Sequence, residues 1–107
     1  MVKSRIQQFG REEEYYSVQD LPRNKGVYHI KDRLDRSKYI GMTKNVRRRM
    51  FVHRNNGLYI EGEKIVFHPA PQGMSQDRLR EHETRLIKWF DPQENDSEGG
   101  EGRRWKK

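Results

Sequence analysis

Cysteine is absent from the 107-residue chain, and only 31% of its residues are apolar. Without thiols the protein can form neither a disulfide nor a thiolate zinc site, so the sequence excludes a zinc finger and indicates a reducing compartment. No apolar run approaches the roughly 20 residues that cross a bilayer, and the polar segment 1–10 lacks the apolar centre of a signal peptide. We therefore expect a soluble, intracellular protein with no membrane partner.

Acidic residues are outnumbered, and the imbalance is confined to one half of the chain. The sequence has 23 Lys and Arg against 16 Asp and Glu, a net charge of +7. Residues 1–54 carry 14 basic and 6 acidic side chains, whereas residues 55–107 carry 9 and 10. Such a basic field attracts polyanions, of which nucleic acid is the commonest in the cell. The alternative is that the surplus only keeps a small protein soluble.

Three short segments mix β-branched and aromatic residues in the way that strands do. They are residues 26–31, 38–41 and 64–68. The first two are separated by a charged, turn-prone stretch, which predicts an antiparallel hairpin. The third segment ends at Pro69, which predicts the end of a strand.

Two helices are expected. The first covers about residues 44–54 with Thr43 as N-cap, and the second covers about residues 75–90 with Ser75 as N-cap. With the three strands they predict an α+β fold: a small, central, antiparallel three-stranded sheet flanked by helices.

Composition divides the chain into three parts, since its length and its 36% of charged residues leave room for one small core. Residues 1–20 are polar and are expected to form an N-terminal arm. Residues 21–95 form the predicted domain. Residues 96–107 are rich in glycine and charge and predict a flexible basic tail.

Glu83 departs from the ordinary pattern of the second helix. At about 100° per residue it falls inside the apolar stripe that contains Leu79 and Phe90. A carboxylate removed from water without a partner is strongly unfavourable. Two interpretations stay open: a core ion pair with an arginine such as Arg49, or a ligand for a hard metal ion such as Mg²⁺ or Mn²⁺.

Two further pairs attract attention, each with an ordinary structural explanation beside the functional one. Arg49 and His53 lie one turn apart on the first helix, and a guanidinium beside an imidazole suits a phosphate. For such an arginine run taken alone, a solvated basic helix face with a packed histidine is the better explanation. Tyr28 and Tyr39 can meet across the hairpin, although most strand tyrosines are packing residues.

Taken together, these residues resemble the GIY-YIG nuclease family. Gly26-Val27-Tyr28 and, after ten intervening residues, Tyr39-Ile40-Gly41 are similar to its two short motifs. The resemblance covers residues 21–95 and rests on six polar positions in order, which are Tyr28, Tyr39, Arg49, His53, Glu83 and Asn95.

This resemblance implies a metal-dependent DNA endonuclease, a phosphodiester hydrolase that uses an activated water and a single divalent ion, Mg²⁺ or Mn²⁺. Tyr28 would help to deprotonate the water, with Tyr39 and His53 in its hydrogen-bonded neighbourhood. Arg49 would neutralise the phosphate, and Glu83 would hold the metal largely through water. Asn95 is expected to orient Glu83 or its water shell.

One departure from the family pattern concerns charge. Met42 follows the second motif where the excision-repair incision nucleases of the family carry a lysine. Lys38 or Lys44 could supply that cation. The residues expected to contact nucleic acid are Lys38, Lys44, Arg47 and Arg48.

Two rival interpretations remain beside the nuclease. One is a non-catalytic nucleic-acid-binding module on the same scaffold, and the other is a basic adaptor for an acidic protein. The expected partner is DNA, which indicates a cytoplasmic or nucleoid-associated location. A domain this small has little surface for reading base edges, so long-site specificity would need a homodimer, a partner protein or the flanking arms.

Overall fold

The computed structural model describes residues 8–95 and confirms the α+β class. In chain order its elements are β1 (Glu13–Tyr15), the 3₁₀ turn η2 (Val18–Asp20), β2 (Gly26–Lys31), β3 (Ser37–Thr43), α1 (Val46–Asn55), β4 (Lys64–Pro69) and α2 (Gln76–Phe90). Neither helix within these residues is long and apolar enough to span a bilayer. The expected tail, and residues 1–7 of the expected arm, lie outside the described part.

The strands form one antiparallel sheet in the order β1-β4-β2-β3, so β3 is an edge strand and β2 lies inside the sheet. The predicted hairpin is confirmed, with Tyr28 opposite Gly41. The prediction of three strands is wrong, because β1 pairs with β4 and adds a fourth. This strand escapes prediction because Glu13 and Glu14 form no apolar pattern, and backbone pairing holds the short segment in place.

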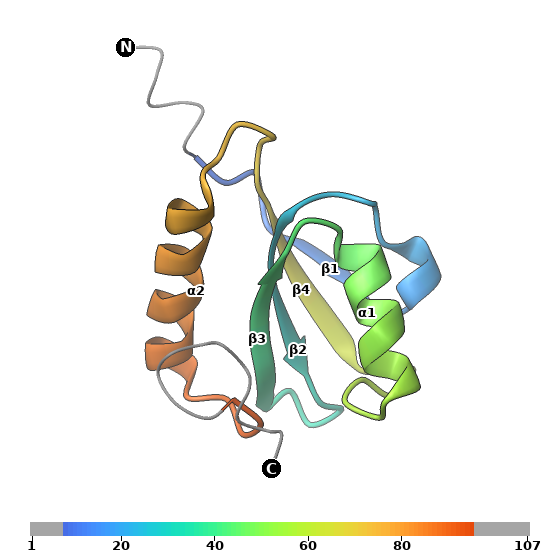
Figure 1. Cartoon of the computed structure of the whole chain (residues 1–107). Helices are drawn as coiled ribbons and strands as arrows, with labels where there is room; N and C mark the ends of the chain where they lie inside the picture. The colour runs from blue at the N-terminus through green and yellow to red at the C-terminus, as the bar shows by residue number, and fades with distance from the viewer. Residues whose placement is uncertain (1–7, 96–107) are drawn as a thin grey trace.

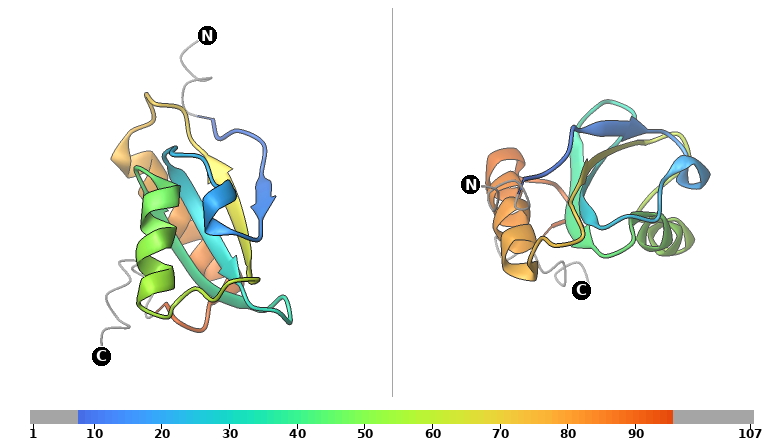
Figure 2. Two further views of the ribbon diagram at one scale, coloured as in Figure 1. Left: turned by 90° about the vertical axis from the view of Figure 1, so that its right-hand side faces the viewer. Right: turned by 90° about the horizontal axis from the view of Figure 1, so that it is seen from above.

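The two helices cover opposite faces of the sheet, as Figures 1 and 2 show. On one face, α1 and η2 pack over a core that includes Tyr28, Met50 and Phe67. On the other face, α2 packs over a second, smaller core that includes Val27 and Leu79. The sheet is therefore buried on both sides, and the side chains of one strand alternate between the two cores.

The first turn of each helix is capped by a polar side chain. Ser75 is the N-cap of α2, as predicted, and its side chain accepts a hydrogen bond from the Arg78 backbone N–H. The prediction that Thr43 caps the first helix is wrong. Asn45 is the N-cap of α1, because Thr43 still pairs with Gly26 as the last residue of β3. The Thr43 hydroxyl instead accepts a hydrogen bond from the Asn45 backbone N–H.

Candidate active site

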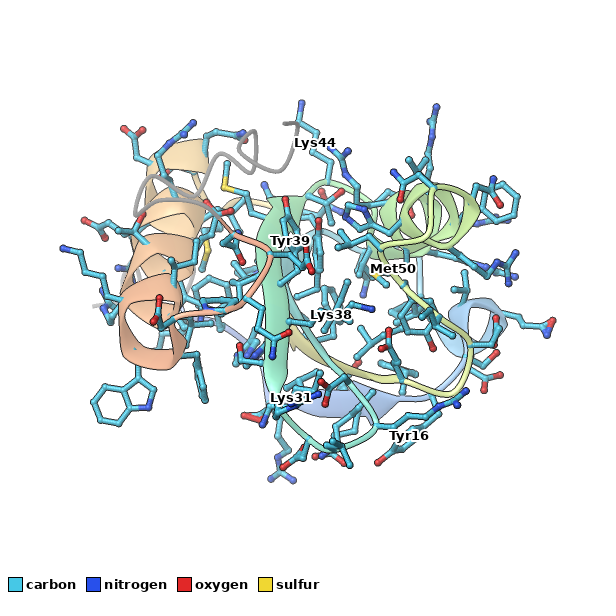
Figure 3. The ribbon with its side chains drawn as sticks, turned by 90° about the horizontal axis from the view of Figure 1, so that it is seen from below. Tyr16, Lys31, Lys38, Tyr39, Lys44 and Met50 are labelled. Carbon is cyan, nitrogen blue, oxygen red and sulfur yellow. The ribbon has the colours of Figure 1, made fainter. Side chains whose placement is uncertain are left out.

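Three buried rings meet between the sheet and α1. Tyr28 comes from β2, Tyr39 from β3 and His53 from α1, and they are 2%, 6% and 4% exposed. The Tyr28 hydroxyl and His53 Nε2 are hydrogen-bonded at 2.8 Å. The centroid of the Tyr39 ring lies 6.1 Å from that of Tyr28 and 5.3 Å from that of His53. Figure 3 shows Tyr39 on the side of β3 that faces α1, toward Met50.

Gly41 makes the room for this cluster. It lies directly across from Tyr28 in the register of β2 and β3. A Cβ atom at position 41 would lie 2.6 Å from Cζ of Tyr28, still closer to its hydroxyl, and 3.1 Å from Cε2 of Tyr39. No role for Gly41 itself was predicted, although its place in the second motif was a signal. The absence of a side chain is what allows the Tyr28 ring to lie over β3.

Two charged residues act on these rings from the two helices. Burial raises the pKa of the Tyr28 phenol well above its usual value, and Tyr39 and the negative charge of Glu83 raise it further. The positive charge of Arg49 acts in the opposite direction. Glu83, on α2, is only 3% exposed, as its position in the apolar stripe predicts, whereas Arg49 is exposed on α1. Charges from both faces of the sheet therefore reach the same phenol.

His53 is neutral at physiological pH. Burial, and secondarily the neighbouring Arg49 guanidinium, lower its pKa to about 4. A neutral imidazole has one nitrogen that can accept a proton and one that carries it. The pair of Tyr28 and His53 therefore consists of a protonated phenol and an uncharged imidazole in hydrogen-bond contact.

Asn95 lies at the exposed edge of the sheet, and both ends of its amide are used on the backbone of Ile40. Its Oδ1 accepts from the Ile40 N–H at 2.7 Å, and its Nδ2 donates to the Ile40 carbonyl at 3.0 Å. The Glu94 N–H also donates to the Lys38 carbonyl. These bonds attach the segment that follows α2 to β3, beside Tyr39 and Gly41.

A hollow of about 580 Å³ lies between α1 and the start of α2, and its lining includes Arg49, whose charge reaches Tyr28 and His53. Three of its lining residues are cationic, namely Lys44, Arg48 and Arg49, and none is acidic. A groove of this charge suits a phosphate backbone. Of the four residues expected to contact nucleic acid, Lys44 and Arg48 therefore line it.

The other two expected contacts lie elsewhere. The Lys38 ammonium is 2.9 and 3.0 Å from the two carboxylate oxygens of Glu63, and both side chains are largely buried. Glu63 therefore neutralises the Lys38 charge inside the protein. Arg47 does not line the 580 Å³ hollow, and instead lines a separate one between α1 and η2.

A family model of the GIY-YIG catalytic domain matches residues 24–96, which are 73 of the 107 residues. The chain belongs to the GIY-YIG family. The match begins two residues before β2 and ends one residue after Asn95, and so includes β2, β3, β4 and both helices. Family membership places this GIY-YIG domain among endonucleases, whose substrate is DNA. No curated protein matches the chain.

GIY-YIG nucleases generally use a divalent metal ion. Among residues 8–95, no group of three or more His, Asp or Glu side chains is placed to hold one. Glu83, the residue expected to hold the ion, is 3% exposed, and the negative charge of its carboxylate reaches Tyr28. Mg²⁺ in particular is commonly held by one or two protein carboxylates and keeps several waters.

Proposed function

We propose that this GIY-YIG domain is a metal-dependent DNA endonuclease that hydrolyses a phosphodiester bond with an activated water and one divalent ion. The observation that carries the proposal is the 2.8 Å contact between the Tyr28 hydroxyl and His53 Nε2, within reach of the charge of Arg49. Arg49 in turn lines a groove that has only cationic and uncharged residues. Hydrolysis needs a nucleophile, compensation for the added negative charge and a stabilised leaving group. Each task has a residue within this site.

Tyr28 and His53 act on the water. The Tyr28 oxygen takes a proton from the attacking water while its own proton passes to His53 Nε2. The water loses one O–H bond, the imidazole gains one N–H bond, and the hydroxide attacks phosphorus. Because the folded environment raises the pKa of Tyr28, a free phenolate is not the resting state. A proton relay to His53 avoids the free phenolate. The imidazolium that it forms is transient, because burial and Arg49 lower the pKa of His53 to about 4. Tyr39 confines the pair from the β3 side.

Arg49 compensates for charge in the transition state. Its guanidinium is exposed in the groove and its positive charge reaches both Tyr28 and His53. A preorganised cation beside the developing negative charge lowers the barrier without reorganisation. Lys44 and Arg48 hold flanking phosphates in the same groove, and Asn95 keeps β3 and the end of α2 in register.

Glu83 would hold the divalent ion, Mg²⁺ or Mn²⁺, which when bound would supply positive charge to the departing 3′ oxygen. One carboxylate suits a single hydrated ion better than a two-metal arrangement.

The first test is plasmid nicking by the full chain and by its Glu83→Gln variant, in Mg²⁺ and in Mg²⁺ with excess EDTA. We expect the wild type to nick only without EDTA. Glu83→Gln should lose roughly 10²-fold or more in rate, because an amide keeps the shape of the side chain and removes its charge. DNA binding, measured by fluorescence anisotropy, should be retained. Glu81→Gln is the matched control, since Glu81 is an exposed carboxylate on the same helix.

Wild-type rates from Glu83→Gln in Mg²⁺ would contradict the proposal. If the wild type binds DNA but does not nick it, the second candidate holds: a non-catalytic nucleic-acid-binding module. One observation favours that candidate, namely that the Glu83 side chain is only 3% exposed.

A further inference from the structure

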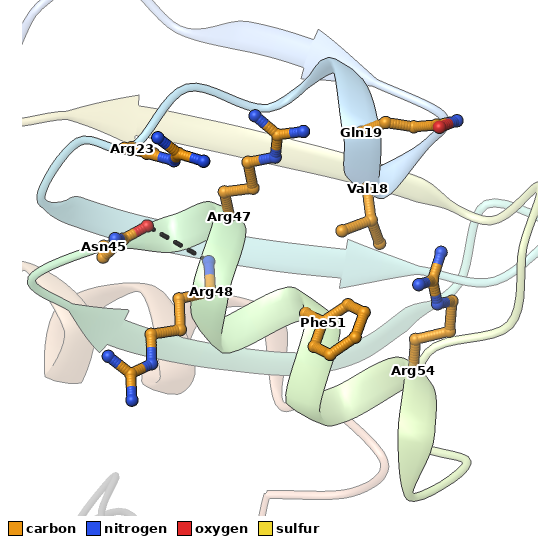
Figure 4. A pocket seen from close by; sticks show the side chains of 8 residues that line it. All are labelled: Val18, Gln19, Arg23, Asn45, Arg47, Arg48, Phe51 and Arg54. Atoms are coloured by element: carbon orange, nitrogen blue, oxygen red, sulfur yellow. Dashed lines mark hydrogen bonds between the residues drawn. The ribbon is translucent and has the colours of Figure 1, made fainter.

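A second hollow of about 490 Å³ lies between η2 and α1, and Figure 4 shows it from close by. Different faces of helix α1 line the two hollows. Arg49 lines the 580 Å³ hollow, whereas Arg47, Phe51 and Arg54 line the second one. We call this hollow the η2–α1 groove. The residues that matter below are Val18, Arg23, Arg47, Arg48, Phe51 and Arg54.

Positive charge dominates this groove. Four of its lining residues are arginines and none is acidic. Within residues 8–95, Arg23, Arg47 and Arg48 make no ion pair, while Arg54 is paired with Glu61 at 2.9 Å. Clustered guanidinium groups without counter-charges repel one another and attract a polyanion. Apart from Arg54, these arginines keep a positive charge that no acidic side chain of the described residues neutralises, and the groove offers it to an anionic ligand.

An aromatic ring lies among these arginines. Phe51 is 48% exposed, although it belongs to a helix whose opposite side is fully buried at Val46 and Met50. The Arg54 guanidinium lies 5.1 Å from the centroid of the Phe51 ring, a cation–π contact. In Figure 4 the ring lies between Arg48 and Arg54, below Val18. An accessible ring with cations on both sides is the arrangement on which bases of a single strand stack.

The η2–α1 groove adjoins the 580 Å³ hollow that Arg49 lines. Asn45 and Arg48 line both hollows, so the two meet at the first turn of α1. From Arg47 to Arg54 the groove follows the helix over eight residues, a rise of about 10 Å at 1.5 Å per residue. A strand that leaves the catalytic groove past Arg48 would enter this one directly.

We propose that the η2–α1 groove binds an unpaired DNA strand, with a base stacked on Phe51 and the phosphates on the surrounding arginines. The inference rests on the proposed function, because the strand belongs to the DNA that is cut in the adjoining groove. The preferred substrate is then duplex DNA with a single-stranded segment beside the cleaved bond. A continuous duplex presents no free base face to Phe51, and an acidic peptide would use the arginines but not the ring.

The test measures binding, not cleavage, in the Glu83→Gln background of the full chain. The probes are fluorescein-labelled oligo(dT) and a blunt duplex of random sequence, titrated by anisotropy. Phe51→Ala should weaken oligo(dT) binding about tenfold, which is the typical value of one stacked base, and should change duplex binding less. Phe51→Trp should preserve oligo(dT) binding. Arg23→Ala should weaken it and lower its dependence on salt by about one phosphate contact.

Trp89→Ala is the matched control, because Trp89 is an exposed aromatic residue, 80% accessible, on the far helix α2. It should leave both affinities unchanged. Thermal unfolding of Phe51→Ala checks that the exposed side chain was not needed for folding. The proposal is overturned if Phe51→Ala binds oligo(dT) as tightly as Trp89→Ala does, or if Phe51→Ala weakens the binding of oligo(dT) and of the duplex equally. It is also overturned if polyglutamate displaces oligo(dT) with the same potency from the wild type and from Phe51→Ala.

These results are separable from the fate of the nuclease proposal. If the wild type does not nick plasmid but Phe51→Ala weakens oligo(dT) binding, the strand-binding proposal stands and the nuclease proposal fails. If the wild type nicks plasmid but Phe51→Ala binds oligo(dT) with unchanged affinity, the nuclease proposal stands and the strand-binding proposal fails.

Discussion

At the scale of single residues, the candidate active site depends on the surroundings of one phenol, that of Tyr28. Tyr28 lies in the interior of the protein, in contact with a neutral imidazole and within reach of charges of both signs. Its position over β3 is possible because residue 41 has no side chain. The proposed chemistry therefore depends on Gly41, which has no side chain to take part in it.

We predict that Gly41→Ala loses nicking and lowers the free energy of unfolding by about 1–3 kcal/mol, the usual cost of overpacking. The added methyl group would displace the Tyr28 ring, and with it the contact to His53. Urea unfolding and plasmid nicking measure the two effects.

Gly57→Ala is the control for this substitution. Gly57 has φ +87, and a Cβ atom there would have no neighbour within 4 Å, so the change should cost about 1–2 kcal/mol through backbone strain alone and leave nicking intact. Wild-type nicking by Gly41→Ala would show that the ring cluster tolerates displacement.

Single positions were predictable where a local pattern decides them. The burial of Glu83 follows from helical periodicity, since every residue of the stripe faces the same side. The partners of Lys38 and Asn95 were not predictable. Lys38 pairs with Glu63, 25 residues away, and Asn95 pairs with Ile40, 55 residues away, and both contacts exist only after the loops have folded.

At the scale of elements, the sequence predicts the helices and three of the strands but not all of their limits. Thr43 and Asn45 are both good N-caps, and only the extent of β3 decides between them. β1 is the missed element, because a three-residue strand is held by the backbone of β4 and needs no apolar pattern of its own. A strand that is held mainly by long-range backbone pairing is therefore the hardest element to predict from a sequence.

We predict that Asn45→Ala lowers the free energy of unfolding by about 1 kcal/mol, because its side chain satisfies the Arg48 backbone N–H at the start of α1. Ser75→Ala should cost a similar amount at α2. Asn45→Asp should keep the cap and the wild-type free energy of unfolding. Urea unfolding of the single and double variants measures both, and the two losses should add because the caps share no partner. An unchanged Asn45→Ala would mean that β3 and η2 hold α1 without its cap.

At the scale of the whole molecule, two thin cores on either side of one sheet hold four buried or half-buried histidines. Three of them, His29, His68 and His82, lie on the α2 side, where His29 contacts Phe90 and His68 contacts His82. Burial lowers the pKa of all four, to about 4 for His29, His53 and His82. In the unfolded chain each would titrate near 6.5.

This difference makes stability depend on pH with a definite sign. Between about pH 6.5 and 4 the unfolded chain binds protons on these histidines and the folded chain does not, so the free energy of unfolding falls as the pH falls through this window. The stabilisation that comes from these histidines is fully present above about pH 6.5. Each histidine with a pKa near 4 should contribute a loss of about 2 kcal/mol by pH 5.

His29→Gln isolates one of these contributions, because glutamine can keep the hydrogen bond to the Ser37 hydroxyl and cannot titrate. We predict that its free energy of unfolding falls less steeply than that of the wild type between pH 6 and pH 5, by about 1 kcal/mol per pH unit. Urea unfolding at pH 5, 6 and 7 measures the slope, and far-UV circular dichroism checks the fold. Equal slopes would mean that His29 takes up its proton without unfolding, and that the core on the α2 side admits a charge.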